Sequence, residues 1–296
     1  MSAPFSGLGV ALATPFSADG ALDLPALRVL VARVVAGGAN FLVPLGTTGE
    51  AATLDEEERE LVILAVLASA NGLPVLAGCG SNSTAVAARW VTRARELGAQ
   101  GALVVTPYYN KPTPEGQFLH FKACADAAPR FPIVAYNVPG RTAVNMSADT
   151  ILRVLELPEV VAVKESSGHL VQIAEVARRL PQGKTLLAGD DNLALPSIAV
   201  GATGLVSVLG NVRPRAIAEL MRAALAGERE RAQALHLRML PLMEALFVES
   251  NPIPVKCALA LEGIGTAAMR LPLTPAREST RTLLQRLLRE CTDDAS

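Results

Sequence analysis

The sequence predicts an α/β protein that folds as a (β/α)8 TIM barrel with a C-terminal helical extension. Three observations support this fold class: eight short aliphatic runs recur along the 296 residues, amphipathic segments of helical period separate them, and the alternation stops after the eighth run. Near-continuous aliphatic runs are typical of parallel strands that are covered on both faces. Strict alternation of such strands with helices indicates a parallel barrel.

The predicted strands are the aliphatic runs, and they cover residues 8–14, 41–45, 74–79, 102–106, 133–137, 160–165, 185–189 and 205–209. The helical segments between them cover residues 23–37, 55–70, 83–97, 114–128, 147–156, 169–180 and 191–200. Asp55, Pro114 and Ser147 stand at starts of these segments, where such residues cap or initiate helices. We therefore assign residues 1–212 to the barrel.

After the eighth strand only helical patterns remain, at residues 214–226, 228–248, 254–262 and 276–290. Residues 213–296 are therefore predicted to form a helical extension packed on the barrel.

The composition excludes several functional classes. Hydrophobic residues make up 50% of the chain and charged residues 19%, which indicates a large core and excludes general disorder. The net charge is −1 and basic residues are scattered, so we expect no nucleic-acid partner. The apolar run at 61–70 is about half the length of a membrane span, and the N-terminus does not have the pattern of a signal peptide. Four widely spaced cysteines favour a reducing compartment over disulfides or zinc. We predict a cytoplasmic protein that has no membrane partner.

The sixth strand ends on a lysine, Lys164, which is one of five lysines in the chain. An ammonium is costly to bury, so a lysine in an apolar strand is either paired with an acid or shifted toward its neutral form. A neutral amine is a nucleophile that forms a Schiff base with a carbonyl compound. Pairing with the adjacent Glu165 and nucleophilic chemistry both remain open from this stretch alone.

Other reactive side chains follow neighbouring strands, at the barrel end where catalytic groups gather. Thr47 and Thr48 follow the second strand, Tyr136 stands at the end of the fifth, and Arg141 follows the fifth. Tyr136, tuned by a neighbour such as Thr47, is suited to proton transfer. Thr48 and Arg141 are suited to holding carboxylates. Each of these residues alone has a plain alternative as a turn or a solvated loop residue, but together they favour catalysis.

Five motifs stand in order along the chain: Gly46–Glu50, 106–110, 136–142, 163–165 and 251–256. With them the chain resembles the dihydrodipicolinate synthase family of pyruvate-dependent Schiff-base lyases, from about residue 8 to residue 288. The resemblance implies condensation of pyruvate with L-aspartate 4-semialdehyde in lysine and diaminopimelate biosynthesis, without a cofactor or a metal.

The resemblance also implies roles for single residues. Lys164 is the Schiff-base lysine, and Tyr136 donates and accepts protons in a relay with Thr47 and Tyr109. Tyr109 reaches into a neighbouring subunit's site, since members are commonly homotetramers built as dimers of dimers. The substrate-binding residues are Thr48 and Val206 for pyruvate, Arg141 for the semialdehyde carboxylate, and Gly189 at the end of the seventh strand.

The chain departs from lysine-inhibited members of that family at two positions. Glu56 stands where they carry a histidine, and Val86 where they carry an acid, although Asn82 and Tyr108 are retained. A bound lysine would lose a carboxylate partner at Val86, a charged hydrogen bond of about 1–3 kcal/mol. We therefore expect weak feedback inhibition by lysine.

Several alternatives stay open. Within the same class, the chain could be another pyruvate-dependent Schiff-base aldolase acting on a sugar acid or a keto acid. In a different class, it could be an inactive barrel that binds a keto acid. Lys256 is the rival lysine, but it lies in the predicted extension, so we expect packing or a salt bridge there. Asp190 and Asp191 stand at the start of a predicted helix, and we interpret them as caps in preference to magnesium ligands.

Overall fold

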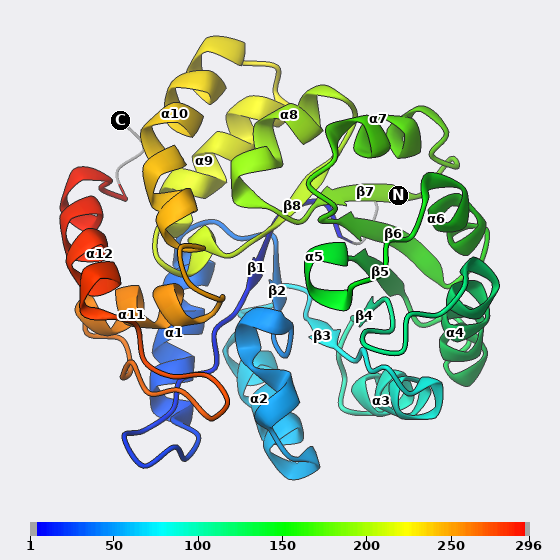
Figure 1. Ribbon diagram of the computed structural model, residues 1–296, viewed down its shortest axis with the longest axis horizontal. Helices are drawn as coiled ribbons and strands as arrows, with labels where there is room; N and C mark the ends of the chain where they lie inside the picture. The colour runs from blue at the N-terminus through cyan, green and yellow to red at the C-terminus, as the bar shows by residue number, and fades with distance from the viewer. Residues whose placement is uncertain (1–4, 294–296) are drawn as a thin grey trace.

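The computed structural model describes residues 5–293, so the first four residues of the predicted barrel and the last three of the predicted extension lie outside it. Eight parallel strands occupy its centre and helices surround them (Figure 1). The strands are β1 (Gly7–Ala11), β2 (Phe41–Val43), β3 (Leu76–Gly78), β4 (Gly101–Val105), β5 (Ile133–Asn137), β6 (Val160–Glu165), β7 (Thr185–Ala188) and β8 (Gly204–Ser207). All eight predicted strands are confirmed.

Each strand pairs with its neighbours in chain order, and β1 pairs with β8. Two backbone hydrogen bonds of 2.9 Å, from Leu42 to Pro74 and from Gly78 to Pro44, join β2 to β3. These bonds bring the two ends of the sheet together as a barrel. The strand β2 is shorter than predicted because Leu45, with a φ of 59°, turns the backbone away from extended geometry.

The helices of the barrel lie outside the strands, and those of eight or more residues match the predicted segments. They are α1 (Leu24–Ala36), α2 (Glu56–Ser69), α3 (Thr84–Glu96), α4 (Pro114–Ala127), α6 (Ala148–Leu155) and α7 (Leu170–Arg178). The short α8 (Ala194–Ala199) follows the turn η3 (Asp191–Leu193). The side chain of Asp55 accepts from Glu58 N at 2.8 Å and the Glu58 side chain accepts from Asp55 N, so a capping box starts α2.

Four helices follow β8: α9 (Pro214–Leu225), α10 (Arg229–Ala245), α11 (Ile253–Leu261) and α12 (Glu278–Glu290). The helix α9 packs against β1, α1, α8 and α10, and α12 packs against α10 and α11 on one side of the barrel (Figure 1). The division of the chain at residue 212 therefore stays a prediction. Among the described residues, no helix has the length and the apolarity that crossing a membrane requires.

The apolar core has two parts, separated by the sheet. A small cluster fills the barrel interior and contains Phe41, Leu103, Tyr136, Ala162 and Val206. The larger cluster lies between the strands and the surrounding helices. Because side chains alternate across a strand, Lys164, two residues after Ala162, faces the interior near the mouth of the barrel.

Candidate active site

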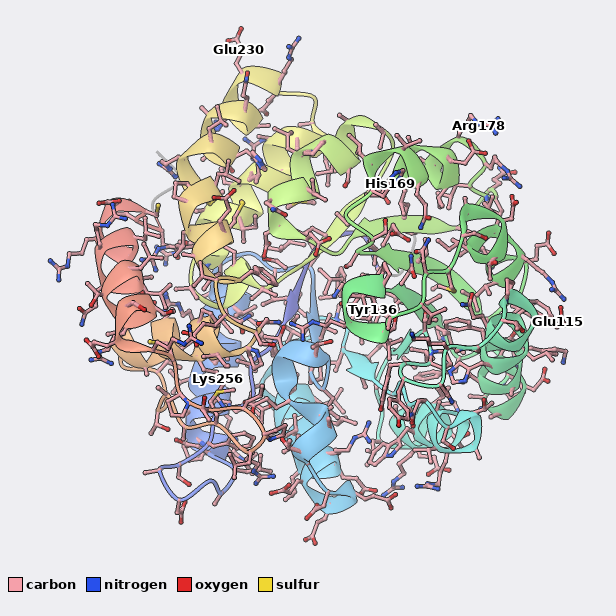
Figure 2. The ribbon with its side chains drawn as sticks, viewed as in Figure 1. Glu115, Tyr136, His169, Arg178, Glu230 and Lys256 are labelled. Atoms are coloured by element: carbon pink, nitrogen blue, oxygen red, sulfur yellow. The ribbon has the colours of Figure 1, made fainter. Side chains whose placement is uncertain are left out.

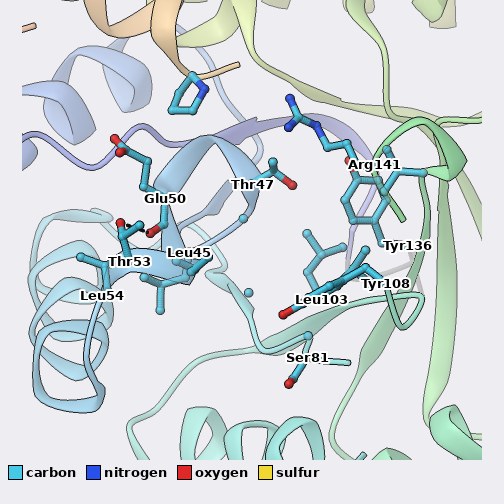
Figure 3. Close-up of a pocket in the computed structure, with 18 of the residues that line it drawn as sticks. Leu45, Thr47, Glu50, Thr53, Leu54, Ser81, Leu103, Tyr108, Tyr136 and Arg141 are labelled. Carbon is cyan, nitrogen blue, oxygen red and sulfur yellow. Dashed lines mark hydrogen bonds between the residues drawn. The ribbon is translucent and has the colours of Figure 1, made fainter. Parts of the chain in front are cut away.

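A cavity of about 520 Å³ opens at the carboxyl ends of the strands. Its wall combines Thr47 from the turn after β2, Tyr136 and Arg141 from β5 and the short helix α5 (Pro139–Thr142), and Asn251 from the C-terminal region. Figure 3 shows Tyr136 and Arg141 on one side of this cavity, with Thr47 facing them. The structure therefore brings three residues predicted from the sequence, Thr47, Tyr136 and Arg141, around one cavity.

Lys164 is 6% exposed, and its ammonium lies 4.0 Å from the centroid of the Tyr136 ring. The two residues are opposite each other in the β5–β6 register. Among residues 5–293, no carboxylate lies within 4.0 Å of the Lys164 amine. The charge of Lys164 acts on Asp190 at longer range: burial raises the pKa of the Asp190 carboxyl, and the charge of Lys164 opposes that rise. The lysine is thus buried beside an aromatic ring without a direct acidic partner.

Glu165 lies on the opposite face of β6 from Lys164. One of its carboxylate oxygens accepts from Ser167 N at 2.7 Å, and the other accepts from Asn137 Nδ2 at 2.9 Å. Burial raises the pKa of the Glu165 carboxyl, and these hydrogen bonds oppose that rise. Glu165 therefore orients the loop after β6, and the alternative in which it pairs with Lys164 is contradicted.

Thr48 is buried in the turn η1 (Thr47–Gly49), and its hydroxyl accepts a hydrogen bond from Asn251 Nδ2 at 2.9 Å. The backbone carbonyl of Asn251 accepts from the Arg141 guanidinium at 3.2 Å. A single residue of the C-terminal region therefore holds both predicted carboxylate-binding side chains. The motif at 251–256 is visible in the sequence, but no role was predicted for Asn251. The spacing of the motif does not show which loop the Asn251 side chain reaches.

The remaining predicted residues lie at different depths. Val206 is fully buried in the barrel interior. Gly189 follows β7, where a methyl group on its Cα would lie 1.7 Å from the hydroxyl oxygen of Ser166, so a larger residue fits only if the side chains of Ser166 and Lys164 move. Tyr109 is 87% exposed and has a φ of 73°. Thr47 lines the cavity, but no hydrogen bond to Tyr136 is present in the described part of the chain, so the proton relay stays a prediction.

Lys256, the rival lysine, lies in α11, away from Tyr136 (Figure 2). Its ammonium is 2.6 Å from Glu50, and both side chains are almost fully buried. The expected salt bridge is confirmed. This ion pair joins α11 to the turn after β2 that carries Thr47 and Thr48.

The interpretation of the two acids after β7 as caps of their own helix is wrong. Neither Asp190 nor Asp191 caps η3 with its side chain. The Asp191 carboxylate instead accepts from the backbone of Val208 and Leu209, at 2.9 Å each, and from Ser207. The Asp191 carboxylate therefore accepts from the backbone amides just after β8. The sequence around Asp191 does not predict this contact.

The fold and the site define a class: a (β/α)8 barrel with a buried lysine at the end of its sixth strand, facing a tyrosine, as in enzymes that form Schiff bases. Comparison with known proteins identifies the group within that class. The model of the dihydrodipicolinate synthetase family matches residues 4–291, and the chain belongs to this family. It is accordingly an enzyme of the Schiff-base lyase class.

Individual relatives agree with this assignment over nearly the whole chain. The 4-hydroxy-tetrahydrodipicolinate synthase of Geotalea uraniireducens is 46% identical over 287 residues, which cover 97% of this chain and 98% of that protein. The dihydrodipicolinate synthase of Thermotoga maritima superposes with a TM-score of 0.94 at 42% identity, covering 97% of this chain and 98% of that one. The enzyme of Acinetobacter baumannii, solved in complex with pyruvate, gives 0.94 at 41% identity and the same coverage.

Proposed function

We propose that this chain condenses pyruvate with L-aspartate 4-semialdehyde to form 4-hydroxy-tetrahydrodipicolinate, in lysine and diaminopimelate biosynthesis. The observation that carries the proposal is a buried Lys164 that faces Tyr136 and has no acidic partner among residues 5–293. The family and the names of the relatives support the same reaction.

The geometry supports a sequence of steps that needs no cofactor. The Lys164 amine adds to the keto carbon of pyruvate, and the carbonyl oxygen leaves as water to give an imine. Tyr136, whose ring centroid lies 4.0 Å from the amine, moves the protons for this step. Loss of a methyl proton gives an enamine, whose carbon attacks the aldehyde of the second substrate. The amino group of that substrate then displaces Lys164 and closes the ring.

The carboxylates of the two substrates need separate cations or hydrogen-bond donors. Thr48 and neighbouring backbone amides hold the pyruvate carboxylate, while Val206 and Gly189 shape the space around it. Arg141 lies at the cavity mouth and holds the carboxylate of the semialdehyde in a two-pronged contact. Asn251 supports both positions, because it is hydrogen-bonded to Thr48 and to Arg141.

The protein acts as a homotetramer built from two dimers, in which Tyr109 completes the site of a neighbouring subunit with Thr47 and Tyr136. The exposure of Tyr109 and its left-handed backbone support this arrangement. A left-handed conformation is costly for a tyrosine, and such strained residues are typical of functional contacts. A second exposed apolar residue, Val171 on α7, is suited to the contact between dimers. The four free, buried cysteines support a cytoplasmic location.

Two other functions are weaker candidates. A sugar-acid or keto-acid aldolase of the same class would carry small polar groups in place of Arg141 for a polyhydroxy substrate. An inactive keto-acid-binding barrel would not need Lys164 and Tyr136 in contact.

A coupled assay separates these functions. Purified protein is mixed with pyruvate, aspartate semialdehyde and the reductase that consumes the product, and nicotinamide oxidation is followed. We expect turnover with the semialdehyde and none with sugar-acid aldehydes. Turnover with sugar-acid aldehydes only would identify the aldolase, and absence of turnover with all of them would identify the inactive barrel.

A further inference from the structure

Ser166 is a buried side chain whose hydroxyl has no hydrogen-bond partner among the described residues. A hydroxyl removed from water without a partner destabilises the folded protein, so such groups are rare and need an explanation. The catalytic groups described above do not include Ser166. Its unused hydrogen-bonding capacity is available to a molecule bound at the site.

The position of Ser166 is fixed by the strand that carries Lys164. Ser166 N donates to Asn137 O at 2.9 Å, which extends the β5–β6 pairing by one residue beyond β6. Residues two apart on a strand point to the same face, so Ser166 and Lys164 both point into the barrel. Ser166 therefore stands one step nearer the mouth than the reactive lysine.

Gly189 shows how close the two side chains are. A methyl group at Gly189 would lie 1.7 Å from Ser166 Oγ and 2.9 Å from Lys164 Cε. Both atoms thus border the same small space beside β7. The Lys164 amine, in contrast, lies over the Tyr136 ring on the β5 side. A group attached to the amine therefore forms next to the space that the Ser166 hydroxyl borders.

We propose that the Ser166 hydroxyl is a catalytic group that hydrogen-bonds to the oxygen at the keto-derived carbon when pyruvate adds to Lys164. In that step the nitrogen–carbon bond forms and the carbonyl oxygen becomes a hydroxyl. A proton relayed through Tyr136 converts this hydroxyl to water, which leaves as the imine forms. Ser166 holds the oxygen in place during both changes and is itself unaltered. This inference rests on the proposed function, because it assigns a residue to the first half of that reaction.

The neighbouring serine provides a matched control. Ser167 lies in the same turn, but its hydroxyl accepts from His169 N at 3.2 Å and the residue is half-buried. Removing the Ser167 hydroxyl alters the same loop without touching the space beside Lys164. A comparison of Ser166→Ala with Ser167→Ala therefore separates a contact with the adduct from an effect on the loop.

The experiment measures the rate at which pyruvate becomes trapped on the protein by borohydride, after mixing times short enough to follow imine formation. One lost hydrogen bond in the transition state slows a step by about tenfold. We expect Ser166→Ala to slow trapping by about that factor and Ser167→Ala to leave it within about twofold. The unfolding midpoint of Ser166→Ala should equal or exceed that of the parent, because an unsatisfied hydroxyl is removed.

Every other outcome overturns the proposal. Unchanged trapping in Ser166→Ala means that the hydroxyl does not touch the pyruvate adduct, and a raised KM for the semialdehyde alone would assign it to the second substrate. Slower trapping with a lowered unfolding midpoint means a structural role. Failure of the parent protein to trap pyruvate would refute the proposed function itself, so the two failures are distinguishable.

Discussion

Lys164 and Lys256 are two buried lysines with similar surroundings and different partners. Each ammonium lies 4.0 Å from the centroid of an aromatic ring, Tyr136 for the first and Phe16 for the second. Lys256 also has a carboxylate, Glu50, at 2.6 Å. Lys164 has no carboxylate within 4.0 Å in the part of the chain that the structure describes. The aromatic contact is common to both, so the carboxylate is what distinguishes them.

The difference follows from what burial does to an ammonium. Burial lowers the pKa of Lys256, and Glu50 opposes that fall; the 2.6 Å ion pair between them joins two parts of the chain. A lysine without such a partner keeps its amine available for chemistry. We therefore propose that the same type of side chain is structural in α11 and reactive at the end of β6.

The largest effect is expected from Lys164→Arg, which keeps a positive charge but removes the nucleophile. We expect kcat to fall by at least about three orders of magnitude, because no covalent intermediate can form. Steady-state kinetics in the coupled assay measures this change. Retention of more than about a tenth of the activity would mean that another group, such as Lys256, forms the imine.

Lys256→Met should instead reduce stability. It leaves Glu50 buried without its partner, which costs about 3–5 kcal/mol in the free energy of unfolding. Urea denaturation measures the loss. The matched control is Lys122→Met, since Lys122 also lies 2.6 Å from a carboxylate but at the surface, where an ion pair contributes about 0.5 kcal/mol. Equal losses in the two variants would contradict the structural role of the buried pair.

Tyr136→Phe keeps the ring over the Lys164 ammonium and removes the hydroxyl. We expect kcat to fall by about a hundredfold or more, the usual contribution of a group that transfers protons. Adduct formation should persist, only more slowly. An unaltered kcat would assign proton transfer to another residue.

Glu165→Gln tests whether the acid next to Lys164 matters for its charge. Because Glu165 bonds to Ser167 and Asn137, we expect a loss of activity below about tenfold and an unshifted pH profile of kcat/KM. A shifted profile would show that the carboxylate acts on Lys164 directly.

The smallest effect is expected for inhibition of the enzyme by free L-lysine. The side-chain ammonium of a bound lysine needs a carboxylate partner, as the ammonium of Lys256 does. Val86 lines the cavity together with Arg59. Burial lowers the pKa of Arg59, and this arginine has no salt-bridge partner among residues 5–293. We expect millimolar lysine to leave more than half of the activity. Val86→Glu should increase inhibition and Val86→Gln should not. Half-inhibition of the parent protein would refute the expectation.

The strands, the longer helices and the reactive residues at the strand ends were predictable because their signals are local. Aliphatic runs define the strands, and the barrel brings their carboxyl ends together. A salt bridge was one of the roles expected for Lys256. Its partner, Glu50, was not predicted, because the two residues are far apart in the sequence. Asp191 shows the same limit, since its hydrogen bonds reach the end of β8.

The sequence predicts that Lys164 faces Tyr136 from the neighbouring strand, and this is confirmed, but the sequence does not show the register that sets them opposite each other. The β5–β6 pairing shifts by one residue between Ile133 and Val134, so that Tyr136 lies opposite Lys164. Without this shift Tyr136 would lie opposite Val163, which packs on the outer face of the sheet. A bulge of this kind leaves no mark in the aliphatic pattern, yet it sets opposite each other the two residues that the proposed chemistry requires.

We propose that Lys164, and not Lys256, forms the imine with pyruvate. Incubation of the parent protein with pyruvate and borohydride, followed by peptide mass spectrometry, tests it most directly. We expect a reduced adduct on the peptide that contains Lys164 and an unmodified Lys256. An adduct on Lys256, or none on Lys164, would contradict it.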